Sequence, residues 1–413
     1  MTNNETLKVL INWVESQPRF KPKSDLKRMT YALEMKQIDL KNSYMVHVAG
    51  TNGKGSVAQF LTQIFLAKGL SVGTFTSPYI LNFNERIHVN GKPLTDEALI
   101  HVLAHVKEFN TSFEQAYGEK LSFFELLTLA SLMVFQHQKL DVVIMEVGIG
   151  GLLDATNAYQ TYDVSLITSI GFDHMKQLGN TLESIAFNKL GILRQGGTLL
   201  TTVDEVLHPY FIQYAKPLDV DVTFVKPEAD IKSTIPLVFK YQGDIFTSGL
   251  SGAYQVSNAI LAIEVARKSP FDMALRDIQT GLRQAYLPAR FESIKDGVIV
   301  DGAHNIHAID ALKKTIRTAY PKHTYHIVFS ALADKDITSM LESLMTFTHQ
   351  IDLVSFPDPR FESLAPFAKH GIRHVETELF LYLDELIKKR YKDELIIITG
   401  SLHFVGYVLN HYK

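Results

Sequence analysis

Between residues 43 and 200 the sequence alternates short apolar runs with longer amphipathic stretches, and this alternation restricts the fold more than any other feature. Short apolar runs are typical of strands buried on both faces, and the longer stretches are typical of helices that cover a parallel sheet. We predict strands over residues 44–49, 71–76, 142–146, 164–170 and 198–202, and helices over residues 56–68, 95–110, 122–138 and 181–193. The pattern therefore predicts an α/β domain with a doubly wound, mostly parallel sheet.

A second α/β pattern follows a less regular stretch. Residues 204–247 contain short β-like pieces, and residues 254–267 and 272–286 have a helical spacing. Leu287-Pro288-Ala289 then favours a linker, because proline restricts the residue before it to extended conformations. Beyond it we predict strands over residues 298–300, 324–329, 350–355 and 394–399, and helices over residues 306–319, 337–344 and 377–390. The predicted domains are residues 1–287 and a smaller α/β domain over residues 288–413.

The composition restricts partners and location. The 413 residues carry a formal net charge of −3 and no cysteine. Because a nearly neutral chain has no overall field to attract polyanions, we expect neither nucleic acid nor a membrane as a partner. The lack of cysteine excludes disulfides, thiolate zinc sites and cysteine nucleophiles. The N-terminus does not resemble a secretion signal, and no apolar stretch reaches the roughly 18 to 20 residues of a membrane helix. We expect a cytoplasmic protein.

The segment Gly50-Thr51-Asn52-Gly53-Lys54-Gly55-Ser56 lies between a predicted strand and a predicted helix, which is the position of a phosphate-binding P-loop. Glycines let the backbone turn so that its N–H groups face an anion, and the lysine can reach the terminal phosphates. The spacing differs from the common motif, and the alternative is a glycine-rich turn with a surface lysine. The predicted ATP-binding residues of this segment are Asn52, Gly53, Lys54, Gly55 and Ser56.

A carboxylate ends the apolar run Asp141-Val-Val-Ile-Met-Glu146. In a nucleotide-binding sheet an acid at this position can hold Mg²⁺ beside the phosphates. The alternative is a solvated residue at the edge of the sheet. Glu146 is therefore a candidate metal ligand only in combination with the loop upstream.

Further short motifs occur in a fixed order over nearly the whole chain. They are Thr76-Ser77-Pro78, Asn84-Glu85-Arg86-Ile87, residues 146–151, 154–157, 171–174 and 188–192, Gln255 with Asn258, and residues 290–292, 301–305 and 399–402. As a set they resemble the motifs of the folylpolyglutamate synthase family, which includes bifunctional dihydrofolate synthases and is related to the Mur ligases. The resemblance implies a Mur-ligase-like fold.

The resemblance also implies a reaction. A carboxylate does not react with an amine until it is activated, so the family transfers the γ-phosphate of ATP to the γ-carboxylate of a folate, and the amine of L-glutamate displaces the phosphate. Charge develops on the transferred phosphoryl group, so catalysis depends on positioning and on cations, of which Lys54 is one. The implied partners are ATP, L-glutamate and a folate, and the family suggests a monomer.

Two Mg²⁺ ions belong to the implied site. Ser77 and Glu146 match ligands of the first ion, and His174 and Lys189 match residues that hold the second. Because an ammonium repels a cation, and because the matching lysine of the family is carbamylated by CO₂, we expect a carbamylated Lys189. The alternatives are a helix-surface lysine and a hydrogen-bonded structural histidine.

The same matches imply that Asn258, Arg290 and Asp301 contact ATP and that His304 is catalytic. Taken alone, Asp301-Gly302 would be read as a turn. The resemblance therefore predicts that both halves of the chain supply residues that contact the nucleotide.

Arg86 and Phe124 are the candidates for contact with the folate, and the alternative for Phe124 is a place in the core. Leu152 stands where many members of the family have arginine, which removes a possible anion contact near the folate.

Three other positions depart from the family pattern: Tyr254 replaces a histidine, Ala289 a glycine and Asn188 a glutamate. None lies in the phosphate loop or among the proposed metal ligands. Two other functions stay open, a Mur-type peptide ligase of cell-wall synthesis and a noncatalytic P-loop ATP-binding module. The residues also leave open whether the chain makes dihydrofolate from dihydropteroate.

Overall fold

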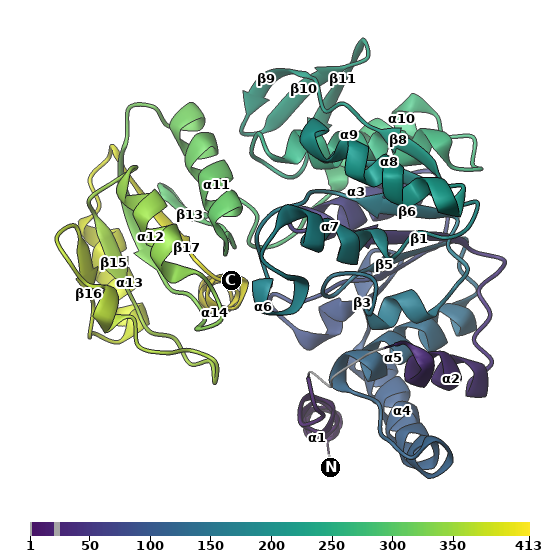
Figure 1. Cartoon of the computed structure of the whole chain (residues 1–413). Coiled ribbons are helices and arrows are strands. Elements are labelled where there is room, and N and C mark those ends of the chain that lie inside the picture. The colour runs from purple at the N-terminus through teal and green to yellow at the C-terminus, as the bar shows by residue number, and fades with distance from the viewer. Residues whose placement is uncertain (1, 20–24) are drawn as a thin grey trace. The chain divides into compact units, whose positions relative to one another are not determined.

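The computed structural model describes residues 2–19 and 25–413, and the chain forms two compact units (Figure 1). The first consists of Met1–Pro227 with Ser257–Ala285, and the second of Glu228–Val256 with Tyr286–Lys413. The predicted domains, residues 1–287 and 288–413, remain a prediction, because compact units defined by contacts need not fold independently.

The first unit is built on an eight-stranded sheet. From edge to edge its strands are β4 (Lys92–Pro93), β3 (Ile87–Val89), β2 (Val72–Phe75), β5 (Val142–Glu146), β1 (Tyr44–Ala49), β6 (Val164–Ile167), β7 (Thr198–Thr201) and β8 (Asp221–Phe224). All neighbours from β2 to β8 are parallel, and β3 is antiparallel to both of its neighbours. This order confirms the predicted doubly wound, mostly parallel sheet.

Helices cover this sheet. In chain order they are α1 (Asn3–Glu15), α2 (Lys27–Met35), α3 (Lys54–Ala67), α4 (Asp96–Tyr117), α5 (Phe123–Gln138), α6 (Met175–Leu178), α7 (Leu182–Leu190), α8 (His208–Ala215), α9 (Gln255–Lys268) and α10 (Leu275–Gln284). In Figure 1, α1, α2, α4 and α5 lie on one face of the sheet, where buried apolar side chains such as Leu103, Leu126 and Phe135 pack against Phe75 and Met145. This apolar cluster joins the helices to the sheet on this face.

The second unit contains two sheets. The strands β9 (Asp230–Thr234), β10 (Leu237–Tyr241) and β11 (Asp244–Ser248) form an antiparallel sheet. The six-stranded sheet has the order β12 (Glu292–Lys295), β13 (Val298–Val300), β17 (Glu394–Thr399), β14 (Thr324–Phe329), β15 (Ile351–Leu353) and β16 (Ile372–His374). Only β12 is antiparallel to its neighbour in this second sheet. The helices are α11 (Ile306–Ala319), α12 (Ile337–Met345), α13 (Leu379–Lys389) and α14 (Leu402–Tyr412). A smaller α/β part with its own core is confirmed.

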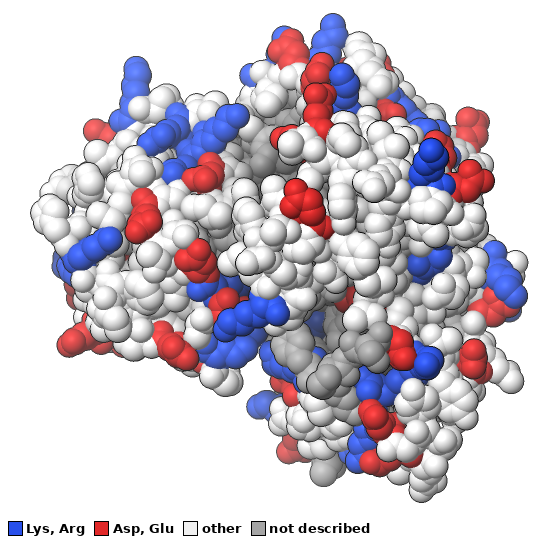
Figure 2. Space-filling view, viewed as in Figure 1, with Lys and Arg blue, Asp and Glu red and all other residues white. Residues whose placement is uncertain are grey.

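The surface carries charges of both signs. On the face shown in Figure 2, lysine and arginine side chains are interspersed with aspartate and glutamate, as the net charge of −3 would suggest. Within residues 2–19 and 25–413, no helix is long and apolar enough to cross a membrane.

A buried carboxylate in the second unit accepts hydrogen bonds from side chains of three neighbouring elements, β14, β16 and α13. Asp352 on β15 is 4% exposed and accepts hydrogen bonds from His326 Nε2 at 2.7 Å, from Arg373 Nη2 at 2.7 Å and from the Tyr382 hydroxyl. Burial raises the pKa of Asp352, but the hydrogen bonds outweigh it and lower that pKa to about 2. The ionised form therefore stabilises the fold.

We expect the substitution Asp352→Ala to lower the free energy of unfolding by about 2–4 kcal/mol, because it removes the acceptor shared by His326, Arg373 and Tyr382. A carboxyl group in an unfolded chain has a pKa near 3.9, so the stabilisation should be complete above about pH 5 and should be lost as the pH falls toward 2. Urea unfolding at neutral and acidic pH measures both effects. The control is Glu385→Ala, which removes an exposed pair with Lys389. A loss no larger than that of the control would contradict the expectation.

Candidate active site

The phosphate loop joins β1 to α3. Gly53 caps the helix with a φ of +90°, and a Cβ atom at this position would lie 2.2 Å from Asn258 Oδ1. Gly50 has a φ of +149°, and its Cβ atom would lie 1.8 Å from Thr168 Oγ1. Only glycine fits at either position, because other side chains would be strained and would collide.

Side chains and backbone after β6 hold the loop in shape. Thr168 Oγ1 donates to the Asn52 carbonyl at 2.6 Å, and the Asn52 N–H donates to Ser169 Oγ at 3.0 Å. The ammonium of Lys54 folds back over the loop and donates to the Gly50 carbonyl at 3.0 Å. Ser56 is buried in the first turn of α3. The predicted residues from Asn52 to Ser56 thus share one helix N-terminus, where N–H groups and the helix dipole favour an anion.

Ser77 and Glu146 lie together beside this loop. Glu146 is the last residue of β5 and pairs with Val48 of β1, and Ser77 follows β2, the other neighbour of β5. The Ser77 N–H donates to Glu146 Oε2 at 3.3 Å, and Glu146 is 4% exposed. Because the carboxyl ends of parallel strands meet at one edge, a hydroxyl and a carboxylate, both suited to Mg²⁺, meet where the phosphate loop begins.

Lys189 lies near the end of α7 and is only 3% exposed, which excludes the helix-surface lysine. Burial and the charge of Lys54 lower the pKa of Lys189, the charges of Asp173 and Asp154 oppose them, and the resulting pKa is about 7. A charged side chain shifts the pKa of another group in this way only when the two lie close together. The fold therefore brings Lys54, Lys189 and two carboxylates into one region of the first unit.

His174 precedes α6 and adopts a left-handed φ of +51°. Its N–H donates to Asp173 Oδ1 at 2.9 Å, and both residues are partly buried. Since Asp173 acts on the charge of Lys189, the loop that carries His174 lies near that lysine. In the described part of the chain no three His, Cys, Asp or Glu side chains lie close enough together to hold a metal ion. The predicted ligands are not a group of that kind, because they include a serine and a lysine.

Asp154 has a structural role that the sequence did not reveal. Its Oδ2 accepts hydrogen bonds from the N–H groups of Gly148 and Ile149 at 3.1 and 3.0 Å, and its Oδ1 accepts one from Thr156 Oγ1 at 2.7 Å. Thr156 in turn contacts the fully buried His47 at 2.8 Å. This chain of contacts holds the loop that follows Glu146. The Asp-x-Thr spacing is a local signal for such a turn.

Arg86 is 7% exposed and lies over three aromatic rings, with its guanidinium carbon 5.1 Å from the ring centre of Tyr79, 5.5 Å from that of Phe83 and 5.2 Å from that of Phe123. Its buried Nε has no hydrogen-bond partner among the described residues, and burial lowers its pKa to about 10. Phe124 is partly buried and packs on Gly148. Arg86 is thus a buried cation with an unsatisfied donor, as expected beside a ligand.

The remaining predicted residues divide between the units. Asn258 lies against Gly53 in the first unit, whereas Arg290, Asp301 and His304 belong to the second. His304 Nδ1 is hydrogen-bonded to the Gly302 carbonyl at 2.8 Å. Within the second unit these three residues lie on the two segments that flank β12 and β13.

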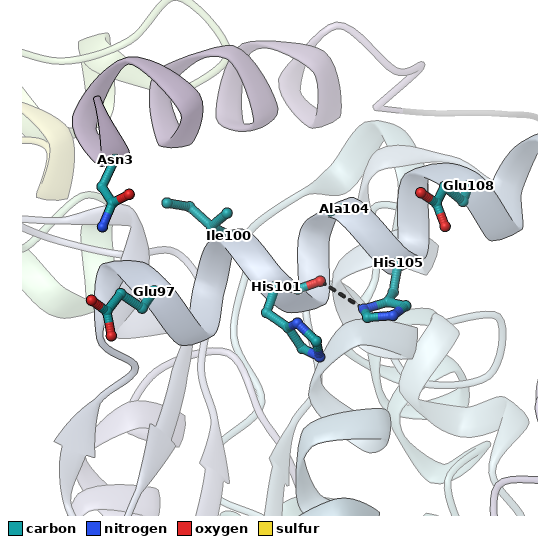
Figure 3. A pocket seen from close by; sticks show the side chains of 7 residues that line it. All are labelled: Asn3, Glu97, Ile100, His101, Ala104, His105 and Glu108. Atoms are coloured by element: carbon teal, nitrogen blue, oxygen red, sulfur yellow. Dashed lines mark hydrogen bonds between the residues drawn. The ribbon is translucent and has the colours of Figure 1, made fainter. Parts of the chain in front are cut away.

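A cavity of about 370 Å³ lies elsewhere in the first unit (Figure 3). It is lined by Asn3 of α1 and by residues of α4, including His101, His105 and Glu108. None of the predicted site residues lines it, so its volume is no argument for the active site.

Comparison with known proteins decides the family. The Mur ligase middle domain matches residues 48–266, and the glutamate ligase domain of Mur ligases matches residues 289–402. A dihydrofolate synthase/folylpolyglutamate synthase of Bacillus subtilis (strain 168) is 34% identical over 425 residues, which cover 97% of this chain and 98% of the relative. The chain belongs to the folylpolyglutamate synthase/dihydrofolate synthase family.

Solved structures of this family agree in fold. Escherichia coli FolC in complex with DHPP and ADP has a TM-score of 0.86 at 27% identity, with 98% of this chain and 97% of that one covered. A bifunctional folylpolyglutamate synthase/dihydrofolate synthase with Mn, AMPPNP and L-glutamate bound has a TM-score of 0.84 at 28% identity and the same coverage. The Mur-ligase-like fold that the motifs implied is confirmed.

Proposed function

We propose that this family member is an ATP-dependent acid–amino-acid ligase that adds L-glutamate to the γ-carboxylate of a folate through an acyl-phosphate. One observation carries the proposal: the phosphate loop, the Ser77–Glu146 pair and the buried Lys189 occupy one region of the first unit. A nucleotide-binding module without catalysis has no need of a buried lysine and carboxylates beside its phosphates. The family favours a folate over a cell-wall peptide as the substrate.

In the proposed first step, a folate carboxylate oxygen forms a bond to the γ-phosphorus of ATP, and the bond from that phosphorus to the β-phosphate oxygen breaks. The N-terminus of α3 holds the phosphates, and the residues concerned are Asn52, Gly53, Lys54, Gly55 and Ser56. Lys54 gives up its hydrogen bond to the Gly50 carbonyl and donates to the charge that develops on the phosphoryl group.

In the second step the amine of glutamate attacks the acyl carbon. The carbon–oxygen bond to phosphate breaks, the amine loses a proton, and the products are an amide and inorganic phosphate. Exclusion of water protects the acyl-phosphate from hydrolysis. We assign nucleotide contacts to Asn258, Arg290 and Asp301 and a catalytic role to His304.

The donor set fits two Mg²⁺ ions. Ser77 and Glu146 supply hydroxyl and carboxylate oxygens for one, and His174 with carbamylated Lys189 would hold the other. When bound, such ions neutralise phosphate charge and align the reacting groups. Carbamylation fits the surroundings of Lys189, because only a neutral amine reacts with CO₂ and burial beside Lys54 favours the neutral form.

Carbamylation of Lys189 has a direct test. We expect carbon NMR with isotope-labelled bicarbonate to show one carbamate signal in the wild-type chain and none in Lys189→Ala. Since the pKa of Lys189 is lowered to about 7, the signal should grow as the pH rises from 6 to 8. We also expect Lys189→Ala to lose on the order of 10²-fold or more in activity, in line with the loss of a charge-stabilising group. Full activity in that variant, or no carbamate in the wild type, would contradict the proposal.

Arg86 and Phe124 are proposed to contact the folate. A buried guanidinium beside aromatic rings suits a flat heteroaromatic ring or a carboxylate. A second activity, formation of dihydrofolate from dihydropteroate and glutamate, is supported by the names of the relatives and by the DHPP in the E. coli protein. Rates of amide formation on dihydropteroate and on tetrahydrofolate, measured side by side, separate the two activities.

The proposed function is tested by the substrate requirement of ATP consumption. We expect phosphate release only when a folate, glutamate and Mg²⁺ are all present. Release with ATP alone would indicate an ATPase, and no release with any folate or pteroate would contradict the proposal. The monomeric state and the cytoplasmic location stay predictions.

A further inference from the structure

The turn that carries Arg290 has an unfavourable backbone conformation. Its two neighbours, Ala289 and Phe291, have left-handed φ values of +59° and +48°, although neither is glycine. Such conformations cost energy and persist only where the surroundings hold them. The buried Nε of Arg290 has no hydrogen-bond partner among the described residues. Because this Nε makes no such hydrogen bond, the conformation of the backbone contributes to the direction of the Arg290 side chain.

Asp301 provides that hold within the second unit. Its carboxylate is 4% exposed, and its Oδ2 accepts a hydrogen bond from the Phe291 N–H at 2.9 Å. Its Oδ1 accepts one from the Ala303 N–H at 2.9 Å, and the Gly302 N–H donates to the Ala289 carbonyl, also at 2.9 Å. The turn is thus fastened on both sides of Arg290 to the segment that follows β13.

Tyr254 completes the arrangement. Its hydroxyl donates to Asp301 Oδ2 at 2.9 Å, the same oxygen that accepts from Phe291. Burial opposes the ionised form of Asp301, and Arg290 favours it. If the Asp301 carboxylate loses this donor, one of its hydrogen bonds inside the protein is missing. Its remaining hydrogen bonds then fix the conformation of the turn less firmly.

We propose that Tyr254 is a positioning residue for nucleotide binding: through Asp301 it fixes the turn at residues 289–291 and so the direction of Arg290. The inference rests on the proposed function, in which Arg290 contacts ATP. Tyr254 occupies a position where the chain departs from its family, and an imidazole N–H could donate the same hydrogen bond.

The test is the variant Tyr254→Phe, which removes only the hydroxyl. We expect its KM for ATP and its Kd for ADP, measured by calorimetry, to rise on the order of tenfold, as for one lost hydrogen bond to a charged group. The KM for glutamate should not change. Tyr254→His should restore most of the nucleotide affinity. The matched control is Tyr412→Phe, which removes a hydroxyl that donates to Asp384 at 2.8 Å and should leave every constant unchanged.

The outcomes separate this inference from the proposed function. Wild-type nucleotide affinity in Tyr254→Phe, or an equal loss for ATP and glutamate, would overturn the positioning role while the ligase activity stands. A loss that Tyr254→His does not recover would also overturn it, because the donor would then not be the cause. If the wild type binds ADP but forms no amide, the proposed function fails, and the calorimetric comparison of Tyr254→Phe with the wild type still decides the inference.

Discussion

Substitution of Lys54 by alanine is expected to lower the rate of ADP formation on the order of 10³-fold. In the structure its ammonium lies over the phosphate loop, 3.0 Å from the Gly50 carbonyl, at the N-terminus of α3. Removal of a cation that faces the transferred phosphoryl group costs roughly 10²- to 10³-fold or more in related chemistries. The measurement is steady-state ADP release with saturating folate and glutamate.

A matched control separates this effect from a general loss of charge. Lys41→Ala removes an exposed lysine paired with Asp39, and its rate should equal that of the wild type. The thermal stability of Lys54→Ala should stay close to that of the wild type, since the side chain contributes only hydrogen bonds to loop carbonyls. A rate for Lys54→Ala within tenfold of the wild type would show that the loop does not bind the reacting phosphates.

Substitution of Glu146 by glutamine should have an effect of similar size. Glutamine keeps the shape and the acceptor that faces the Ser77 N–H, but it removes the negative charge that suits a magnesium ion. We expect a loss on the order of 10²- to 10³-fold in turnover at the Mg²⁺ concentration that saturates the wild type. A titration of activity against Mg²⁺ measures it.

The shape of the Mg²⁺ titration distinguishes a ligand from a structural residue. If Glu146 holds the ion, higher Mg²⁺ should recover part of the activity of Glu146→Gln. The control Glu385→Gln changes an exposed carboxylate and should titrate as the wild type does. A variant that loses activity with an unchanged Mg²⁺ midpoint would contradict the role as a ligand.

Local patterns explain why much of the fold could be predicted. The buried strands β1, β5 and β17 consist mainly of apolar residues, so their positions follow from the sequence pattern. Among the described residues, five helices were not predicted: α1, α2, α6, α8 and α14. The prediction ended at residue 399, although Ser401 caps α14 and its apolar residues recur at helical spacing. The α8 helix has Pro209 in its first turn, where proline is favoured, but the surrounding stretch looked β-like.

The candidate site was predictable where its residues are close in sequence. The phosphate loop and the acid at the end of β5 are local signals, and the structure places them together. Long-range packing was not predictable, and it decides the burial of Lys189 and the aromatic surroundings of Arg86. The hydrogen bond from Tyr254 to Asp301 spans 47 positions in the sequence, so no spacing rule reveals it.

The structure shows the conformation or the contacts of each residue that departs from the family pattern. Ala289 stands in place of a glycine and adopts a left-handed conformation, and Tyr254 stands in place of a histidine and donates to Asp301. Leu152 and Asn188 lie side by side, and the Leu152 N–H donates to the Asn188 carbonyl at 2.7 Å. None of these four departures lies in the phosphate loop.

Mass spectrometry of the reaction product provides the decisive measurement for the ligase proposal. The chain would be incubated with ATP, Mg²⁺, tetrahydrofolate and L-glutamate, and the folate products and ADP would be quantified together. We predict a folate that is heavier by one glutamyl residue, joined through the γ-carboxylate, in a molar amount equal to that of ADP. ADP formed without such a product, or tetrahydrofolate recovered unchanged, would contradict the proposal.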